Sequence, residues 1–326
     1  MNSQRILIAL LLTVCITGFG SLFVGAVQLS VTEVLQVLWT ADKQEFIINQ
    51  YRLPRMILAI GVGAGLGLSG ALVQGIIRNP LASPDLMGIS AGAGLAATAL
   101  LVYWPSAPLY WLPLMALIGG LGAAAMIMAL AYWSKPTPAR LALIGIAISA
   151  FLASGIDFLM IVNPIEINTA MIWLTGSLWG RNWQQVPFIW WSLSILIPFF
   201  SYWLAWRLDV MGLGEESAAS LGISPSKVQV LALTCAVVLA SISVSVCGTI
   251  SFVGLLAPHL SRLLFFGHNH KLSLLGAAVI GALLVLVADV MARGIQPPIE
   301  LPAGVLTSLI GAPYFIFLLQ RYKGWS

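Results

Sequence analysis

Charged side chains are scarce in this sequence. Only 8% of its 326 residues are Asp, Glu, Lys or Arg, whereas 60% are apolar. Soluble domains contain about 25% charged and about 45–50% apolar residues. With 15 basic and 11 acidic side chains, the chain cannot cover a globular surface with polar groups. The composition therefore excludes a soluble enzyme and a disordered protein, and it predicts an integral membrane protein.

The sequence also lacks the usual signs of its own chemistry. Its three cysteines lie inside apolar runs and show no zinc-site or disulfide spacing. None of its five lysines follows a glycine, so there is no phosphate-binding loop ending in Gly-Lys-Ser/Thr. The formal charge of +4 is too small for a nucleic-acid-binding surface. We therefore do not expect an enzyme, and the chain shows no cofactor or metal motif.

What the sequence has instead is long apolar runs. About 20 residues at 1.5 Å rise cross a hydrocarbon core of about 30 Å. We expect ten membrane helices in one domain spanning residues 1–326, at about 6–25, 56–77, 86–103, 111–133, 141–162, 186–206, 228–247, 249–267, 272–292 and 303–320. The first run resembles a signal peptide, but nine more runs follow and we interpret it as a span. Gly248, Gly254 and Pro258 interrupt the eighth, where a half-helix or re-entrant element is an alternative.

Basic residues near the ends of the runs predict the orientation. If the N-terminus is cytoplasmic, ten basic residues lie inside and five outside. The inner residues are Arg5, Arg78, Lys135, Arg140, Arg207, Lys227, Arg262, Lys271, Arg321 and Lys323, and the outer ones are Lys43, Arg52, Arg55, Arg181 and Arg293. Both termini are therefore expected in the cytoplasm.

Glycine and proline mark the second run and the turn after it. Residues 61–75 contain six glycines, which allow neighbouring helix backbones to approach closely. This predicts tight packing near the centre of a bundle. The following segment, residues 79–85, contains two prolines that end one helix and begin the next, with Ser83 or Asp85 as the expected cap of the third span.

Few ionisable residues lie within the apolar runs. Asp157 and Asp289 are the candidates for an ion-coupled carrier, but Asp289 precedes Arg293 by four residues, and a helical ion pair is the simpler interpretation. Arg52 and Arg55 precede the second run on the outer side. They fit either interfacial anchors or a docking site for an acidic partner.

The longest polar stretch on the inner side runs from about residue 208 to 227. Within it, Glu215, Ala218, Ala219 and Gly222 fit a short helix that ends at a glycine, followed by a turn at Ser224. Such a helix is suited to docking in a cleft of another protein, although it is also compatible with a simple connection.

Together these segments resemble one family, the FecCD-type permease subunits of bacterial ATP-binding-cassette importers for iron(III)-siderophores, haem and vitamin B12. The resemblance runs from about residue 50 to the C-terminus. It rests on Tyr51–Arg55, Arg78–Asp85 with Gly88, Gly214–Glu216 with Leu221–Gly222, Gly248–Leu255 with Pro258–His259, and Glu300–Gly304 with Gly311–Pro313. Residues 171–181 and 296–300 are most similar to the ferric-citrate branch.

The resemblance implies a type II importer permease of ten transmembrane helices in the bacterial inner membrane. Its expected partners are a second permease (a paralogue rather than an identical copy), two cytoplasmic ATPases that bind ATP and magnesium, and a periplasmic binding protein. The expected function is import of a ferric-siderophore, with ferric citrate as one candidate, by alternating access. An ion-coupled secondary carrier remains the alternative, and a membrane-embedded enzyme based on His259 is disfavoured because no acid–base pair accompanies it.

The resemblance also implies roles for residues in three places. Arg52, Arg55 and Arg293 would dock the binding protein. Coupling to the ATPase would involve residues of the short inner helix and its flanks, namely Gly214, Glu215, Glu216, Ala218, Ala219, Leu221 and Gly222. The cytoplasmic gate would be formed by Asn79, Leu81, Thr137, Pro138 and Ala139.

Overall fold

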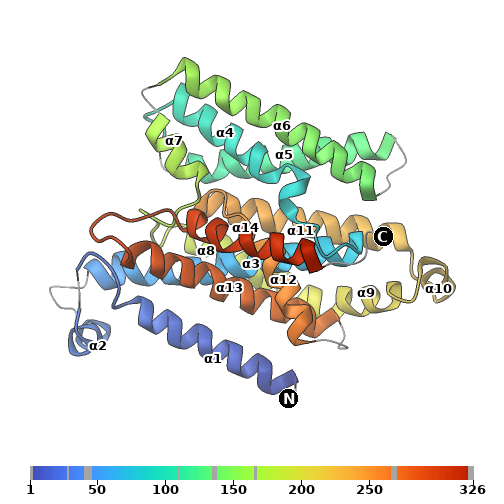
Figure 1. The fold of residues 1–326 in the computed structure, drawn as a ribbon, viewed down its shortest axis with the longest axis horizontal. Coiled ribbons are helices and arrows are strands. Elements are labelled where there is room, and N and C mark those ends of the chain that lie inside the picture. Colours follow the sequence, from blue (N-terminus) through green and yellow to red (C-terminus); the bar gives the residue numbers. More distant parts are fainter. Residues whose placement is uncertain are drawn as a thin grey trace.

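The computed structural model describes residues 3–27, 29–39, 46–108, 110–133, 138–164, 167–265 and 270–321. Within these ranges the chain is helical and contains no strand. Most helices run along a common direction, as in a membrane bundle (Figure 1). The expected all-α class is therefore confirmed.

The helices follow the predicted apolar runs closely. They are α1 (Ser3–Ser21), α2 (Val31–Trp39), η1 (Phe46–Arg52), α3 (Leu53–Ile77), η2 (Pro84–Met87), α4 (Ile89–Tyr103), α5 (Trp111–Trp133), α6 (Pro138–Val162), α7 (Ile167–Leu174), α8 (Val186–Phe199), η3 (Phe200–Leu204), α9 (Ala205–Met211), α10 (Glu215–Ser220), α11 (Pro225–Cys247), α12 (Val253–Leu264), α13 (His270–Gly294) and α14 (Ala303–Arg321). Each predicted run falls on a helix.

Not all of these helices are long enough to cross a bilayer alone. In the described ranges, six meet the length and composition of a membrane span, at Ser3–Ser21, Phe46–Ile77, Trp111–Leu130, Leu143–Val162, Pro225–Cys247 and His270–Gly294. Four shorter apolar helices accompany them, at Ile89–Tyr103, Val186–Phe199, Val253–Leu264 and Ala303–Leu318. The count of ten crossings stays a prediction.

Helix α3 is the centre of the bundle, and its glycines explain why. A Cβ atom at Gly63 would collide with the carbonyl of Gly281, one at Gly67 with that of Ala277, and one at Gly70 with that of Gly254. The α3 backbone therefore lies directly against the backbones of α13 and α12. Close backbone approach is how small residues stabilise helix pairs in lipid, and the predicted tight packing is confirmed.

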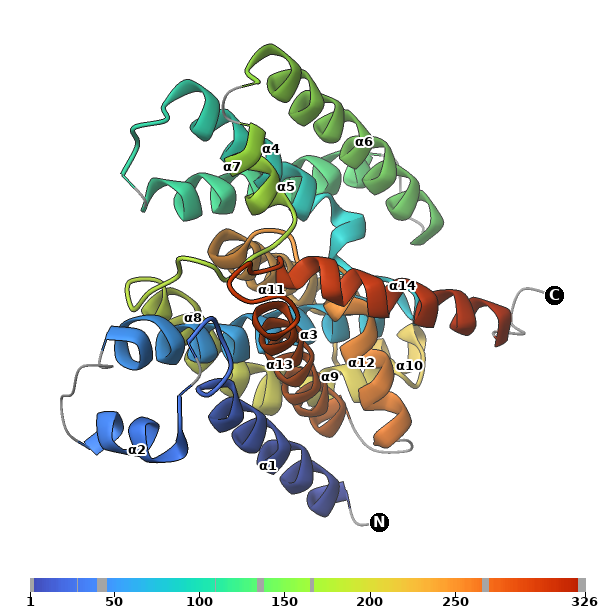
Figure 2. The ribbon, with the colours of Figure 1, turned by 60° about the vertical axis from the view of Figure 1, so that its left-hand side comes forward.

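Helices α4, α5, α6 and α7 form a second group beside this centre (Figure 2). Helix α4 packs along α5 and α6, and α5 contacts α11 of the central group. Gly92 of α4 and Gly119 of α5 face each other, where a Cβ on either would meet the backbone of the other. The two groups meet at η2, which contacts α6, α11 and α3.

The predicted eighth span is broken, but in one place only. Helix α11 ends at Cys247, and residues 248–252 are not helical before α12 begins at Val253. Gly248 and Phe252 take positive φ angles of 76° and 67°. Gly254 and Pro258, by contrast, lie inside α12, so the expectation that they interrupt the helix is wrong. Non-helical backbone at this depth is tolerated where protein buries it or where it lines a cavity.

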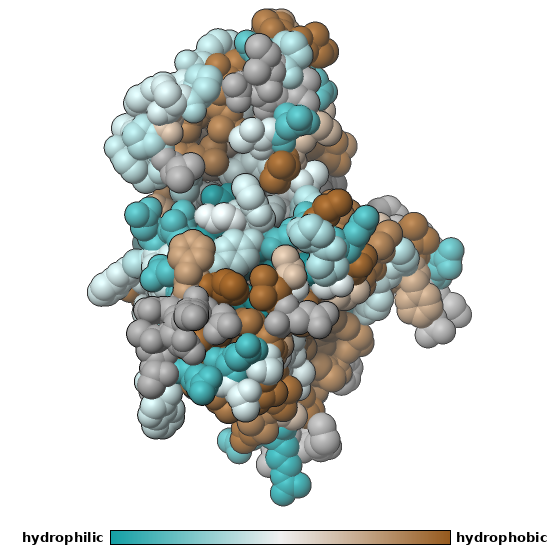
Figure 3. Space-filling model, turned by 90° about the vertical axis from the view of Figure 1, so that its left-hand side faces the viewer, coloured by the Kyte–Doolittle hydropathy of each residue, from teal (hydrophilic) through white to brown (hydrophobic). Residues whose placement is uncertain are grey.

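The two ends of the bundle differ in what they carry. The start of α1, the end of α14 and the short helix α10 lie at one end, which we call the inner end, while α2 and the link between α13 and α14 lie at the other, the outer end (Figure 1). The face at the outer end shows hydrophilic residues among hydrophobic ones (Figure 3). The shared end of α1 and α14 agrees with both termini lying on one side of the membrane.

Candidate functional site

The three arginines predicted to dock a partner lie together at the outer end, but they are buried. The exposed fractions are 2% for Arg52, 1% for Arg55 and 1% for Arg293. The Nε atom of Arg55 donates to Asp289 Oδ1 at 2.8 Å, and its Nη1 atom donates to Glu300 Oε2 at 2.5 Å. Arg55 therefore joins α3 to α13 and to the link before α14.

Further bonds tie the same residues together. The hydroxyl of Tyr51 donates to Glu300 at 3.0 Å, and Arg55 Nη1 donates to that hydroxyl at 3.0 Å. The Nε atom of Arg293 lies 3.2 Å from Asp289 Oδ2, one helical turn away. The helical ion pair predicted for these two residues is confirmed. We call Tyr51, Arg52, Arg55, Asp289, Arg293 and Glu300 the outer network.

The outer network also holds the chain between α1 and α2. Arg52 donates from Nη1 to the carbonyl of Leu22 at 2.5 Å and from Nη2 to the carbonyl of Val27. Arg293 donates from Nη1 to the carbonyl of Val24 at 3.1 Å. Guanidinium groups suit this role because each has several donors in a fixed plane. The arginines thus fasten the loop after α1 onto α3 and α13.

The outer network is one negative charge short. Three guanidinium groups face two carboxylates, and Nη2 of Arg293 is buried without a hydrogen-bond partner in the described part of the chain. A cavity of about 230 Å³ lies against Arg52, Arg293, Tyr51 and Glu300. A buried charge is costly unless it is paired. The geometry therefore suits an additional anion at this cavity.

The structure shows that these arginines are buried, which the sequence did not predict. Spacing before a membrane helix suggested charges displayed at the surface, whereas the side chains point inward and bind the protein itself. The sequence reading assigned no role to Tyr51 or Glu300. Glu300 lies 245 residues from its partner Arg55, so no local pattern connects the two.

At the inner end, the predicted short helix is present as α10. It follows Gly214, whose φ is 111°, and it is closed by Gly222 with φ of 80° and a hydrogen bond from Ile223 N to the carbonyl of Ala218. Ala218 is buried, while Leu221 is 61% exposed. Positive φ angles at both flanking positions explain why glycine occupies them. The helix with its glycine end is confirmed.

The turn after α3 differs from expectation in its capping. Helix α4 follows Gly88 and has no side-chain cap, so neither Ser83 nor Asp85 caps it. Instead, Asn79 Oδ1 accepts the backbone N–H of Leu81 at 2.9 Å. This bond closes the turn at the first predicted gate position. Leu81 lines the central cavity described below.

The second predicted gate position is described only in part. Pro138 and Ala139 are the first residues of α6, and Thr137 lies outside the described residues. The gate stays a prediction.

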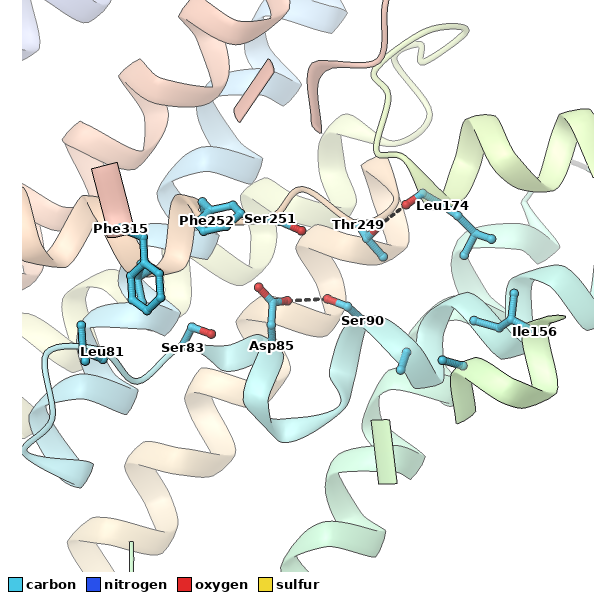
Figure 4. Close-up of a pocket in the computed structure, with 13 residues that line it drawn as sticks. Leu81, Ser83, Asp85, Ser90, Ile156, Leu174, Thr249, Ser251, Phe252 and Phe315 are labelled. Carbon is cyan, nitrogen blue, oxygen red and sulfur yellow. Dashed lines mark hydrogen bonds between the residues drawn. The ribbon is translucent and has the colours of Figure 1, made fainter. Parts of the chain in front are cut away.

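A central cavity of about 490 Å³ lies between the two helix groups (Figure 4). Its walls come from the turn after α3, from η2, α4, α6, α7, α12 and α14, and from the break after α11. The lining residues are Leu81, Ser83, Asp85, Ser90, Ala91, Ala153, Ile156, Leu174, Thr249, Ser251, Phe252, Leu255 and Phe315. Ligand sites in proteins have volumes of about 300–1,000 Å³, mostly apolar walls and a few polar groups.

Among the described residues that line the central cavity, Asp85 is the one that is charged. Its Oδ1 atom accepts a hydrogen bond from the Ser90 hydroxyl at 2.5 Å, and both groups point into the cavity (Figure 4). Burial raises the pKa of the Asp85 carboxyl, and the bond from Ser90 opposes this effect. Thr249 on the opposite wall donates to the carbonyl of Leu174.

The carboxylates considered for an ion-coupled carrier do not form such a site. Asp157 is exposed on α6, and Asp289 is bound by Arg55 and Arg293. Among the described residues, no group of three or more His, Cys, Asp and Glu side chains could hold a metal ion.

Comparison with known proteins gives a match over nearly the whole chain. The model of the FecCD transport family matches residues 10–321, more than the stretch from residue 50 expected from the motifs. The Fe(3+)-citrate import system permease protein YfmE of Bacillus subtilis is 46% identical, over 97% of this chain and 93% of the relative. The Fe(3+) dicitrate transport system permease protein FecD of Escherichia coli is 41% identical, over 98% of this chain and 100% of the relative.

A solved structure has a similar fold over nearly its whole length. It is described as an inward-facing conformation of a metal-chelate type ABC transporter, with a TM-score of 0.86 and 32% sequence identity. The match covers 98% of this chain and 99% of that one.

Proposed function

The chain belongs to the FecCD transport family, and from this premise we propose that it is the permease subunit of an ATP-driven importer of ferric citrate. The observation that carries the proposal is the full-length similarity to two ferric-citrate permeases, at 46% and 41% identity. In this assembly the chain moves the chelate from the periplasm to the cytoplasm by alternating access. ATP and magnesium bind to separate ATPase subunits, and a paralogous permease completes the pathway.

The inner end supports coupling to the ATPase. Helix α10 projects from the bundle at this end (Figure 1), with Leu213 and Leu221 69% and 61% exposed. Exposed apolar side chains on both flanks of a short helix suit a cleft on a protein partner. The buried Ala218 fixes the helix to α9 and α11. We expect α10 and its flanking residues to transmit the ATPase motion to the bundle.

The outer end supports docking of a binding protein through its acidic residues. The outer network carries one excess positive charge, and its cavity borders Arg52 and Arg293. An incoming carboxylate would bind in this cavity beside Arg52 and Arg293. Since Arg55 is fully engaged by Asp289 and Glu300, it would support the site from behind. Docking thus depends on a cavity rather than on exposed arginines.

The interior supports a transport path with its gate at the inner end. The central cavity is bordered by Leu81, one of the predicted gate residues, and by the non-helical segment 248–252. Cavities of this kind are where membrane proteins place broken helices. In the membrane, the inner end would face the cytoplasm of the bacterial cell, together with both termini.

The decisive experiment is reconstitution with the paralogous permease, the ATPase and the binding protein in liposomes. We expect uptake of radioactive iron as ferric citrate only when ATP and the binding protein are both present. Uptake by this chain alone, driven by an ion gradient, would show instead a secondary carrier. Alanine at Glu215 and Glu216 should leave ATP hydrolysis intact but abolish most uptake.

A further inference from the structure

The central cavity combines one carboxylate with two helix N-termini. Helices α4 and α12 both begin at its wall, at Ile89 and Val253, and neither has a side-chain cap. The start of an α-helix carries roughly half a positive charge. Two such starts together amount to about one positive charge, which the carboxylate of Asp85 offsets when ionised. The cavity is thus close to electrical neutrality, although it is polar.

This balance matters for an anionic cargo. Helix N-termini with free N–H groups bind carboxylates and phosphates. Without a compensating charge, the cavity would hold a negatively charged chelate tightly and slow its release. Four hydroxyl side chains, Ser83, Ser90, Thr249 and Ser251, line the same walls. Ser90 and Thr249 already donate their hydroxyl protons to Asp85 and to the carbonyl of Leu174. Ser83 and Ser251 can therefore donate to oxygen atoms of a chelate without adding charge.

We propose that the central cavity is a transit site for the ferric chelate, and that Asp85 keeps it from retaining anionic chelates by offsetting the two helix N-termini. The inference rests on the proposed function, since it takes the transported chelate as the occupant. It assigns selectivity within the permease to the charge of one residue. Asp85 acts here on the passing chelate, and the bond from Ser90 holds its carboxylate toward the cavity.

Alternative roles for Asp85 predict different behaviour. If it served only to hold η2 and the start of α4 together, replacing it would affect all substrates equally. If it bound cationic cargo, its removal would weaken binding. Our proposal predicts a gain of binding, limited to anionic chelates. The sign and the selectivity of the effect therefore separate the three roles.

The test uses the assembled complex of both permeases and the ATPases in nanodiscs, without the binding protein. Ferric citrate, which is anionic, and a neutral ferric hydroxamate are the two probes, each with radioactive iron. For Asp85→Asn we expect ferric citrate to bind about tenfold tighter than in the wild type, the scale of one unit charge about 12 Å away at an effective dielectric constant of about 20. Binding of the neutral chelate should not change.

The matched control is Asp157→Asn, which removes the same charge from an exposed position on α6 next to the cavity-lining Ile156. It should leave both probes unaffected. The inference is overturned if Asp85→Asn does not change citrate binding, if it changes both probes equally, or if the control behaves in the same way.

A second variant tests the opposite sign and covers the case in which Asp85→Asn does not assemble. Ser83→Asp adds a negative charge to the same cavity, and it should slow ferric-citrate uptake about tenfold while neutral chelate uptake continues. Equal loss of both would refute the charge argument. Failure of the proposed function is distinguishable, because the wild-type complex would then import no ferric citrate at all.

Discussion

The outer network and the central cavity use buried charge in opposite ways. In the outer network, Arg55 has a carboxylate on each side, at 2.8 Å and 2.5 Å. Its hydrogen bonds link α3 to η1, to α13 and to the segment before α14. In the central cavity, a single carboxylate faces hydroxyls and helix ends. Tight pairing immobilises the parts that it joins, whereas a balanced but open site lets a ligand pass. The comparison separates charges that hold the fold from charges that meet the cargo.

The largest effect is expected at Arg55. Arg55→Leu leaves the carboxylates of Asp289 and Glu300 buried without their main partner, and breaking a buried pair from one side costs about 3–5 kcal/mol. We expect the variant to lose most of its folded fraction in detergent, as measured by thermal unfolding. Adding Glu300→Leu should restore part of the loss, because it removes the carboxylate that is ion-paired with Arg55, while Asp289 keeps Arg293 as its partner. Equal stability of Arg55→Leu and the wild type would show that the network does not hold the fold.

A smaller effect is expected at Arg293, where the network has its excess charge. Arg293→Gln makes the network neutral overall, so its stability should change less than that of Arg55→Leu. The affinity for the binding protein should fall about tenfold, the scale of about 1.4 kcal/mol, as measured by surface plasmon resonance at low salt. Lys227→Gln, at the inner end, is the control with the same loss of charge. An unchanged affinity would remove the outer cavity as the docking site.

Glu300 lines the same outer cavity as Arg293 and carries the opposite charge. Glu300→Gln keeps the size of the side chain but raises the net charge of the outer network by one. We expect somewhat tighter docking of the binding protein, by a factor of about 3–10, together with a modest loss of thermal stability. Weaker docking would mean that Glu300 contacts the partner itself.

The smallest effect is expected for the stability of Asp85→Asn. Burial raises the pKa of the Asp85 carboxyl, so the native state binds this proton more tightly than the unfolded state does. Stability therefore falls as the pH rises from the unfolded-state pKa of about 4 to the raised native pKa, and it stays lower above that. The variant should melt a few degrees higher than the wild type at alkaline pH, and the difference should vanish as the pH falls to about 4. A variant that melts lower at alkaline pH would show that Asp85 holds the fold, like the outer network.

Much of the molecule follows from local patterns that the sequence displays. Each apolar run predicted from the sequence falls on a helix, because a helix in lipid must be apolar along its length. Gly222 predicted the end of α10, because few other residues take its backbone angle. The i,i+4 spacing of Asp289 and Arg293 predicted their contact, since helical neighbours are set by the helix itself.

The sequence left a question open, or predicted wrongly, where a local pattern has two outcomes. Arg52 and Arg55 before a membrane helix can face water or turn inward, and only the positions of α1, α13 and Glu300 decide between these. Gly254 and Pro258 suggested a break, but α12 continues through both. Pro258 removes one backbone hydrogen bond, and membrane helices tolerate proline where neighbouring groups satisfy the freed carbonyl. The expected cap at Ser83 or Asp85 gave way to Gly88, because Asp85 faces the central cavity.

The sequence by itself determined the membrane class, the helices, the closely packed glycine face of α3 and the inner helix α10, since each depends on residues near one another in the chain. Only the tertiary structure decided that Arg55 meets Asp289 and Glu300, 234 and 245 residues away, and that Asp85 shares a cavity with Thr249 and Phe315. The physical reason is that such pairings depend on how whole helices pack, and packing is decided by shape and burial along the entire bundle.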